Sequence, residues 1–318
     1  MKKVFVAGAT GGMGTALVNE LVSRGIEVIA FARNKDNLQS KFENIQFVQC
    51  ISGDVLNYKE LLHAVKGADL IIHAVSFPYE SWKDKHIPCL ENLLNAAKSI
   101  NSSFVMIDNI YAYGKTTSPI DENSSKLPHT KKGKLRLQME KVIEDHDVPY
   151  IITHIPDLFG PSAVNTTLYS TLQSVVLDKN AYFLGRMDIK REFAYTLDVA
   201  KSVIELASNK KHYDQHWNIP GCLHISGNEL QDFLRTHYHY SKNMKAATYK
   251  KIAFLSIFST FMAEQKEMMY LTEAPMILDG ERLEKALEFI PLSDGWDSLK
   301  ETIKWIKYKE INEQNKAI

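Results

Sequence analysis

The first fourteen residues constrain the fold more than any other part of the chain. Residues 4–7 form a short apolar run, which leads into a series of glycines and then into a helical pattern over residues 15–22. Glycines let a backbone approach a phosphate closely, and a helix N-terminus offers free N–H groups and the positive end of a dipole. This strand, turn and helix predict a dinucleotide pyrophosphate site formed by Gly8, Thr10, Gly11, Gly12, Met13 and Gly14.

Strand patterns alternate with helical patterns through the first half of the chain. We expect strands at residues 3–7, 27–32, 45–50, 70–74, 104–107 and 150–154. We expect helices at residues 12–23, 58–66, 85–100 and 132–145. Such alternation is typical of a parallel sheet with helices on both faces. The predicted fold class is therefore α/β, a Rossmann-type doubly wound parallel sheet.

The alternating pattern loosens after Pro156, where helical segments predominate. Residues 165–177 and 196–208 have helical patterns, and Ser226 to Glu229 fit a capping box that opens another helix. These features predict a smaller, mostly helical C-terminal lobe over the crevice at the strand ends. We expect a nucleotide-binding domain at 1–160. Residues 161–318 would then supply the remaining sheet elements and a substrate-binding lobe, interleaved in one compact unit.

Charge and cysteine usage argue against several classes of partner. The chain has 38 basic and 38 acidic residues and a net charge of +0, so no basic stripe suggests nucleic acid. Its 3 cysteines lie far apart, which argues against disulfides or a zinc site, and the histidine spacing predicts no metal. We expect a small-molecule substrate and a monomer or homodimer.

Two segments outside the alternating pattern have their own interpretations. The apolar stretch 252–262 is too short to span a bilayer and is interpreted as a buried helix. Residues 116–130 are rich in Ser, Pro, Asn and Lys and are interpreted as a long surface loop. Since the N-terminus leads directly into a core strand, we expect no signal peptide, no membrane partner and a cytoplasmic location.

The end of the second predicted strand bears on the choice of cofactor. NAD sites usually carry an acid there for the ribose 2′-hydroxyl, but the sequence has Arg33, with Lys35 nearby. A guanidinium can bind a 2′-phosphate with two parallel hydrogen bonds, so NADP(H) is favoured over NAD(H). The alternative is that both cations are ordinary loop residues. Further candidate cofactor contacts are Asp54, whose alternative role is a helix N-cap, and Ala74, Val75 and Ser76.

Three later segments resemble extended short-chain dehydrogenase/reductases. They are Asp-Asn-Ile-Tyr-Ala-Tyr-Gly at 108–114, Ile-Pro-Asp-Leu-Phe-Gly-Pro at 155–161 and Arg-Glu-Phe-Ala-Tyr-Thr-Leu-Asp-Val-Ala at 191–200. The spacing Gly-x-x-Gly-x-x-Gly is also similar to that of extended and atypical members. Residues 267–270 and 274–279 resemble the C-terminal lobe of members grouped as NAD(P)-dependent epimerase/dehydratase-like. The resemblance implies the fold and the cofactor, but it does not specify a reaction.

The resemblance also indicates where catalytic residues belong, and the sequence departs from the family there. The family carries a Tyr-x-x-x-Lys pair on the helix after the fifth strand. Counting back from Glu140, these two positions fall on Lys132 and Arg136, and no tyrosine lies between positions 113 and 150. Asn109 stands at the serine position of the fifth strand. The lack of the conventional pair leaves the source of the proton open.

Tyr111 is the candidate replacement acid. It lies where sugar-nucleotide dehydratases carry an acidic side chain. The tyrosine in place of that acid argues against a dehydratase reaction. If it faces the nicotinamide, Lys132 or Arg136 would tune its pKa. The alternative is that Tyr111 packs under the lobe and that both cations belong to a solvated helix start. Tyr113 is expected to be structural.

Three hypotheses about function follow. The first is an NADP(H)-dependent oxidoreductase acting on a small carbonyl or enone, with polarisation by Tyr111 and Asn109. The second is a non-catalytic NADP(H)-binding redox sensor or regulator, which the missing Tyr-x-x-x-Lys pair suggests. The third is a sugar-nucleotide epimerase, which would need a base and tightly held NAD. His154 replaces the family's sixth-strand arginine, so a charge that a sugar-nucleotide diphosphate would use is missing.

Overall fold

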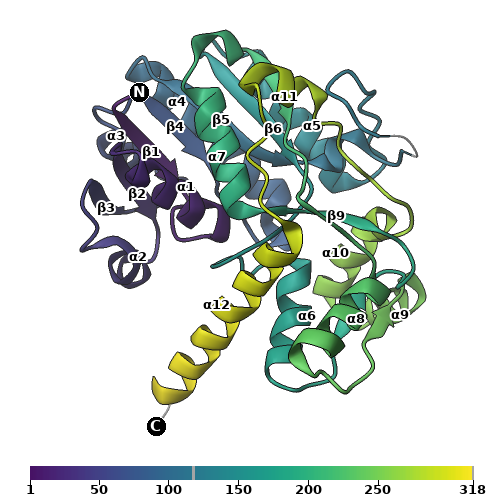
Figure 1. Ribbon diagram of the computed structural model, residues 1–318. Helices are drawn as coiled ribbons and strands as arrows, with labels where there is room; N and C mark the ends of the chain where they lie inside the picture. Colours follow the sequence, from purple (N-terminus) through teal and green to yellow (C-terminus); the bar gives the residue numbers. More distant parts are fainter. Residues whose placement is uncertain (117–118, 317–318) are drawn as a thin grey trace.

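A sheet of seven parallel strands forms the centre of the computed structural model, which describes residues 1–116 and 119–316 (Figure 1). The strand order is β10-β6-β5-β4-β1-β2-β3. The order changes direction between β1 and β4, which is where a doubly wound sheet opens a ligand crevice. The predicted fold class is confirmed. The strands are β1 Lys3–Ala7, β2 Glu27–Ala32, β3 Val48–Ser52, β4 Leu70–His73, β5 Ser103–Asn109, β6 Tyr150–Ile155 and β10 Gln215–Asn218.

The central strands place apolar side chains on both faces of the sheet because helices cover both faces. In β1, Val4 and Val6 belong to one apolar core, and Phe5 and Ala7 belong to the other. The first core includes α1 (Gly12–Ser23), α2 (Lys35–Phe42), α7 (Thr196–Ala207) and α11 (Glu281–Leu287). The second includes α3 (Tyr58–Ala64), α4 (Trp82–Ser99) and α5 (Lys131–Glu144).

The second half of the chain adds β10 to the main sheet and packs α7 and α11 against it, and its other elements form a mostly helical lobe. In Figure 1 this lobe lies below the sheet, with α12 (Gly295–Lys316) projecting toward the C-terminus. The expected capping box at Ser226 and Glu229 is present. The other lobe elements are α6 Thr167–Val176, α8 Gly227–Tyr238, α9 Tyr249–Leu255, α10 Thr260–Met268, and the short strands β7 Asp157–Phe159, β8 Tyr182–Leu184, β9 Arg191–Tyr195, β11 Leu223–Ile225 and β12 Lys245–Ala247.

Some predicted element boundaries were wrong. The third strand begins at Val48 rather than at residue 45, because the chain turns at Phe47, where φ is +70°. Helix α2 was not expected. Asn34 caps it by accepting a hydrogen bond from the Asn37 N–H at 2.8 Å, and only two of its side chains are buried. Helix α4 begins at Trp82, three residues before the predicted start.

The prediction of a buried helix at 252–262 was also wrong. The stretch is divided between α9 and α10, and Ile257 and Phe258 in the connection are 72% and 76% exposed. Ile252 is buried, but most of the large apolar side chains that follow it are exposed, so apolar character alone did not indicate burial. Among the residues that the structure describes, no helix has the combination of length and apolarity needed to cross a bilayer.

The segment predicted as a surface loop at 116–130 contacts the rest of the protein at two points. Two of its residues, Thr117 and Ser118, lie outside the described residues. Ile120 is buried and forms a bridge with Leu278, and Lys126 lies partly buried beside the main sheet. The loop therefore connects the nucleotide-binding half to the lobe.

Candidate functional site

The glycine turn after β1 forms a close-packed cradle. Gly8 has a φ of +83°, and a Cβ there would lie 2.6 Å from the Ala74 carbonyl oxygen. A Cβ on Gly14 would lie 2.8 Å from Ala9 Cα and closer still to the Gly8 carbonyl oxygen. Only glycine permits this approach of α1 to the turn. The first turn of the helix is thereby fixed directly behind the end of β1.

The N-terminus of α1 is suited to an anion. Its N-cap is Gly11, which has no capping side chain, and its first turn contains no acidic residue. A Cβ on Gly11 would have only the Gly8 oxygen near it, at 3.4 Å, so the space above this residue is open. Free N–H groups and the helix dipole favour a phosphate at such a terminus. The residues present therefore fit a dinucleotide pyrophosphate.

Arg33 lies beside this turn. An open depression of about 420 Å³ is lined by Thr10, Arg33 and Asn34. Arg33 is exposed and directly precedes the N-cap of α2, so its side chain is available to a ligand. The structure thus brings together the predicted phosphate turn and the predicted 2′-phosphate ligand.

The remaining predicted cofactor residues lie on both sides of the turn. The backbone of Ala74 and Val75 meets Gly8, as the distances from a Gly8 Cβ show, and Ser76 follows in an exposed position. Asp54 is not the N-cap of α3, because Asn57 fills that role. Instead, Asp54 Oδ1 accepts a hydrogen bond from the Leu56 N–H at 3.0 Å and shapes the loop after β3.

Lys41 is a cation near α1 that the sequence patterns did not indicate. Its Nζ lies 3.3 Å from Thr15 Oγ1 and 3.1 Å from Ser162 Oγ. Burial lowers the pKa of Lys41, and its hydrogen bonds go to hydroxyls rather than to a carboxylate. The side chain places positive charge beside the first turn of the phosphate-binding helix.

Two tyrosine hydroxyls meet at the end of β5. Tyr111 lies in a 3₁₀ turn (Ile110–Tyr113), and its hydroxyl oxygen lies 3.0 Å from that of Tyr79. Asn109 Oδ1 accepts the Tyr111 N–H at 3.0 Å, so Asn109 caps the turn and positions Tyr111. Burial raises the pKa of both tyrosines, and Tyr111 is raised further by its neighbour Tyr79. Both hydroxyls are therefore protonated near neutral pH.

Arg136 lies close to the tyrosine pair, in a buried polar setting. Its Nη1 lies 3.2 Å from Asp108 Oδ1, and its guanidinium carbon lies 4.4 Å from the Trp82 ring centre. Nearby, the Arg136 Nε, the second Asp108 oxygen, and ring nitrogens of His73 and His86 are buried without a hydrogen-bond partner among the described residues. Unpartnered buried polar atoms are rare in proteins, so this group of residues is a candidate contact for a polar group of a ligand.

Lys132 joins α5 to the lobe. The side chain is buried, and its ammonium pairs with Glu264 and lies 2.8 Å from Glu267 Oε2, both on α10. It also lies 4.7 Å from the centre of the Tyr79 ring. Lys132 is therefore not part of a solvated helix start. The Lys132 ammonium forms ion pairs with the two lobe carboxylates. It does not lower the pKa of Tyr111, which is raised by burial.

The pairing of Lys132 with Glu267 predicts an acid-sensitive attachment of α10. Burial opposes ionisation of Glu267, but hydrogen bonds and the Lys132 charge hold its pKa below the usual 4.5. Its stabilising effect is therefore present above pH 4.5 and is lost as the pH falls through the lower folded-state value. We expect Glu267→Gln to lower the free energy of unfolding by about 1 kcal/mol at pH 7 and by much less at pH 3.5.

Urea unfolding at the two pH values measures this difference, with Glu273→Gln, an exposed glutamate on the same lobe, as the matched control. An equal loss for Glu267→Gln at both pH values would show that the ion pair does not stabilise the lobe.

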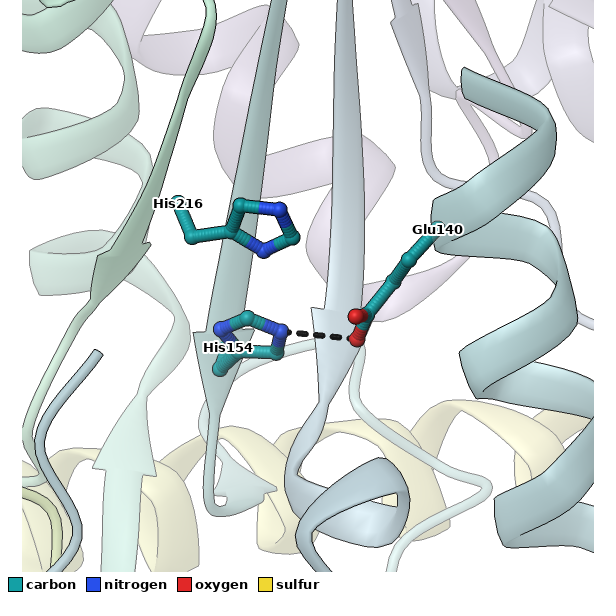
Figure 2. A group of neighbouring side chains, drawn as sticks. All are labelled: Glu140, His154 and His216. Atoms are coloured by element: carbon teal, nitrogen blue, oxygen red, sulfur yellow. Dashed lines mark hydrogen bonds and ion pairs between the residues drawn. The ribbon is translucent and has the colours of Figure 1, made fainter. Parts of the chain in front are cut away.

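Tyr113 belongs to a separate buried network. Its hydroxyl donates to Asn218 Oδ1 at 3.1 Å and lies 3.3 Å from His154 Nδ1. The other nitrogen of His154 donates to Glu140 at 2.9 Å, as Figure 2 shows. Burial, reinforced by the Lys126 charge, lowers the pKa of His154 to about 3, so this histidine is neutral near pH 7. Tyr113 and His154 thus link the sheet to α5.

His216 completes a group of potential metal ligands with Glu140 and His154 (Figure 2). The sequence spacing did not reveal this group, because its members come from α5, β6 and β10. Lys126 Nζ lies among them, 2.5 Å from Glu140 and 3.1 Å from His216 Nδ1. The ammonium supplies the positive charge that the carboxylate requires, and it holds the 116–130 loop against the sheet.

The fold and the site together define a Rossmann-type dinucleotide-binding protein with a smaller C-terminal lobe. Residues 8–182, more than half of the chain, match the family model described as NAD(P)H-binding. The chain belongs to this NAD(P)H-binding family. Its fold is that of epimerase/dehydratase-like short-chain dehydrogenases, as the sequence motifs predicted.

Individual relatives are distant. The chain is 21% identical over 232 residues to methionine adenosyltransferase 2 subunit beta of Xenopus tropicalis, across 72% of this chain and 68% of that one. It is 31% identical over 114 residues to 2-alkyl-3-oxoalkanoate reductase of Shewanella oneidensis, across 36% of this chain and 28% of the reductase. The structure of UDP-glucuronic acid 4-epimerase from Bacillus cereus in complex with NAD superposes with a TM-score of 0.79 at 19% identity, covering 96% of this chain and 99% of the epimerase.

Proposed function

We propose that this protein is an NADP(H)-dependent reductase of a small carbonyl or enone. The observation that carries the proposal is the pair of protonated hydroxyls at Tyr111 and Tyr79, held next to Arg136 at the end of β5. Bound nicotinamide would supply the hydride. The relative that is named a 2-alkyl-3-oxoalkanoate reductase supports the reaction class over 36% of this chain.

NADP(H) is the proposed form of the cofactor. Arg33 lines the depression beside Thr10, where no acidic residue is present to bind a ribose 2′-hydroxyl. Lys41 adds a second positive charge near the same helix terminus. Two cations, and a depression whose lining residues include no carboxylate, favour the extra phosphate of NADP(H).

Each of the residues around Tyr111 has a separate proposed role in the reduction. Tyr111 is the proposed donor to the substrate oxygen, because a protonated phenol stabilises negative charge that develops there. Tyr79 orients its hydroxyl, and Asn109 fixes the turn that carries it. Arg136 is the proposed contact for a second polar group of the substrate, since its Nε has no partner among the described residues. Lys132 holds α10 over the crevice, which excludes water.

A non-catalytic NADP(H)-binding regulator is the second candidate. The position that the resemblance assigns to the catalytic tyrosine carries Lys132, whose charge is taken up by α10. A relative that matches 72% of this chain is named as a subunit of methionine adenosyltransferase, not as a reductase. Sugar-nucleotide epimerisation is the third candidate. The likeness to an epimerase structure supports it through the fold alone.

Consumption of NADPH across a panel of ketones, aldehydes and enones tests the proposal. The reductase hypothesis predicts steady turnover with at least one class of carbonyl. Saturable NADPH binding without turnover on any member would contradict it and favour the regulator. Tightly bound NAD that survives purification would instead favour the epimerase.

A further inference from the structure

The connection between α9 and α10 carries an unusually exposed apolar surface. Five large side chains form this surface, which we call the apolar tip. Within it, Phe254 and Phe258 contact each other with ring centres 5.7 Å apart. Large contiguous apolar patches on a protein surface usually mark a binding surface. The members of the tip, with their exposed fractions, are Phe254 64%, Leu255 44%, Ile257 72%, Phe258 76% and Phe261 51%.

The charge around the apolar tip is mostly positive, because Glu264 and Glu267 of α10 are paired with Lys132. Residues 242–263 contain four lysines and no aspartate, glutamate or arginine, although the whole chain has equal numbers of basic and acidic residues. Lys245, Lys250 and Lys251 are exposed. Lys242 pairs with Asp178, so three cations remain to give the hairpin a local positive potential.

We propose that the α9–α10 hairpin docks on an anionic phospholipid surface. The apolar tip would enter the boundary between headgroups and acyl chains, and Lys245, Lys250 and Lys251 would contact the headgroups. Exposed aromatic and aliphatic side chains flanked by lysines are the combination that binds at the interface without spanning a membrane. No membrane partner was expected from the sequence, where the stretch 252–262 was interpreted as a buried helix too short to span a bilayer.

A second copy of the chain fits this surface less well. In a twofold dimer the same patch meets itself, so the three lysines of one copy would face those of the other. A bilayer that contains anionic lipid pairs the apolar tip with hydrocarbon and the lysines with opposite charge. The hairpin is also held in place by Glu264 and Glu267, which bind Lys132 at the edge of the crevice.

Co-sedimentation of the full chain with vesicles tests this proposal. We compare phosphatidylcholine vesicles with vesicles containing about one third phosphatidylserine. The protein is expected to bind the anionic vesicles about tenfold more tightly, and added salt should weaken that binding. The double variant Ile257→Ser/Phe258→Ser should lose most of the binding. Lys250→Gln/Lys251→Gln should reduce the preference for anionic lipid.

Phe289→Ser is the matched control, because Phe289 is 55% exposed but lies outside the hairpin. It should leave vesicle binding unchanged. The NADPH affinity and melting temperature of each variant show that the fold is retained. Absence of binding to anionic vesicles, or equal binding by the Ile257→Ser/Phe258→Ser variant, overturns the proposal. A dimer that the tip variant dissociates, without vesicle binding, would assign the surface to a second copy instead.

Discussion

Gly14→Val is expected to abolish cofactor binding and to destabilise the fold by about 3 kcal/mol or more. A Cβ at this position would lie 2.8 Å from Ala9 Cα and closer to the Gly8 oxygen, both of which are backbone atoms. The turn cannot yield without moving α1 away from the end of β1. Urea unfolding measures the stability, and NADPH fluorescence titration measures the binding.

Gly11→Ala is the matched control for the packing argument. Gly11 has a φ of −72°, and a Cβ there would have its nearest neighbour at 3.4 Å. The alanine should therefore change the free energy of unfolding by less than about 1 kcal/mol. If Gly14→Val unfolded at the same urea concentration as the unmodified protein, the close packing of α1 on the turn would not be a requirement of the fold.

Tyr111→Phe is expected to lower kcat about 10²–10⁴-fold on whichever carbonyl the protein reduces. The substitution removes the proposed donor to the substrate oxygen and leaves the ring in place. Because the donor acts on charge that develops during the reaction, KM should change much less than kcat. Steady-state NADPH oxidation measures both constants.

Tyr79→Phe is the companion variant. It keeps the Tyr111 hydroxyl but removes the partner at 3.0 Å, so its effect on kcat should be smaller than that of Tyr111→Phe. Turnover that persists undiminished in Tyr111→Phe would remove this residue from the mechanism and leave the proton to another group.

The main sheet and the phosphate turn could be predicted because their signals are local. The apolar run of β1 and the glycines that follow it are contiguous in the sequence, and backbone sterics then leave few arrangements open. Helix α2 escaped prediction because it is short and buries only Leu38 and Phe42. The predicted third strand began too early because Phe47 extends the apolar pattern, although its φ of +70° places a turn there.

The surroundings of Tyr111 and Lys132 could be predicted only in part because their contacts join distant segments of the chain. Tyr111 was identified as a candidate, but its partner Tyr79 lies 32 residues away. The sequence patterns did not indicate that Glu264 and Glu267 would meet Lys132, more than 130 residues earlier in the chain. The apolar stretch 252–262 was misassigned because an apolar segment usually packs inside, and only the tertiary structure shows that this one does not.

The affinity of the protein for NADPH and for NADH tests the central claim most directly. We predict that the unmodified protein binds NADPH about 10–100-fold more tightly, as expected for charge-assisted hydrogen bonds to one phosphate. Arg33→Ala should remove this difference and leave the affinity for NADH unchanged, because Arg33 is exposed and NADH lacks the phosphate. Equal affinity for the two cofactors in the unmodified protein, or a preference that persists in Arg33→Ala, would contradict the account.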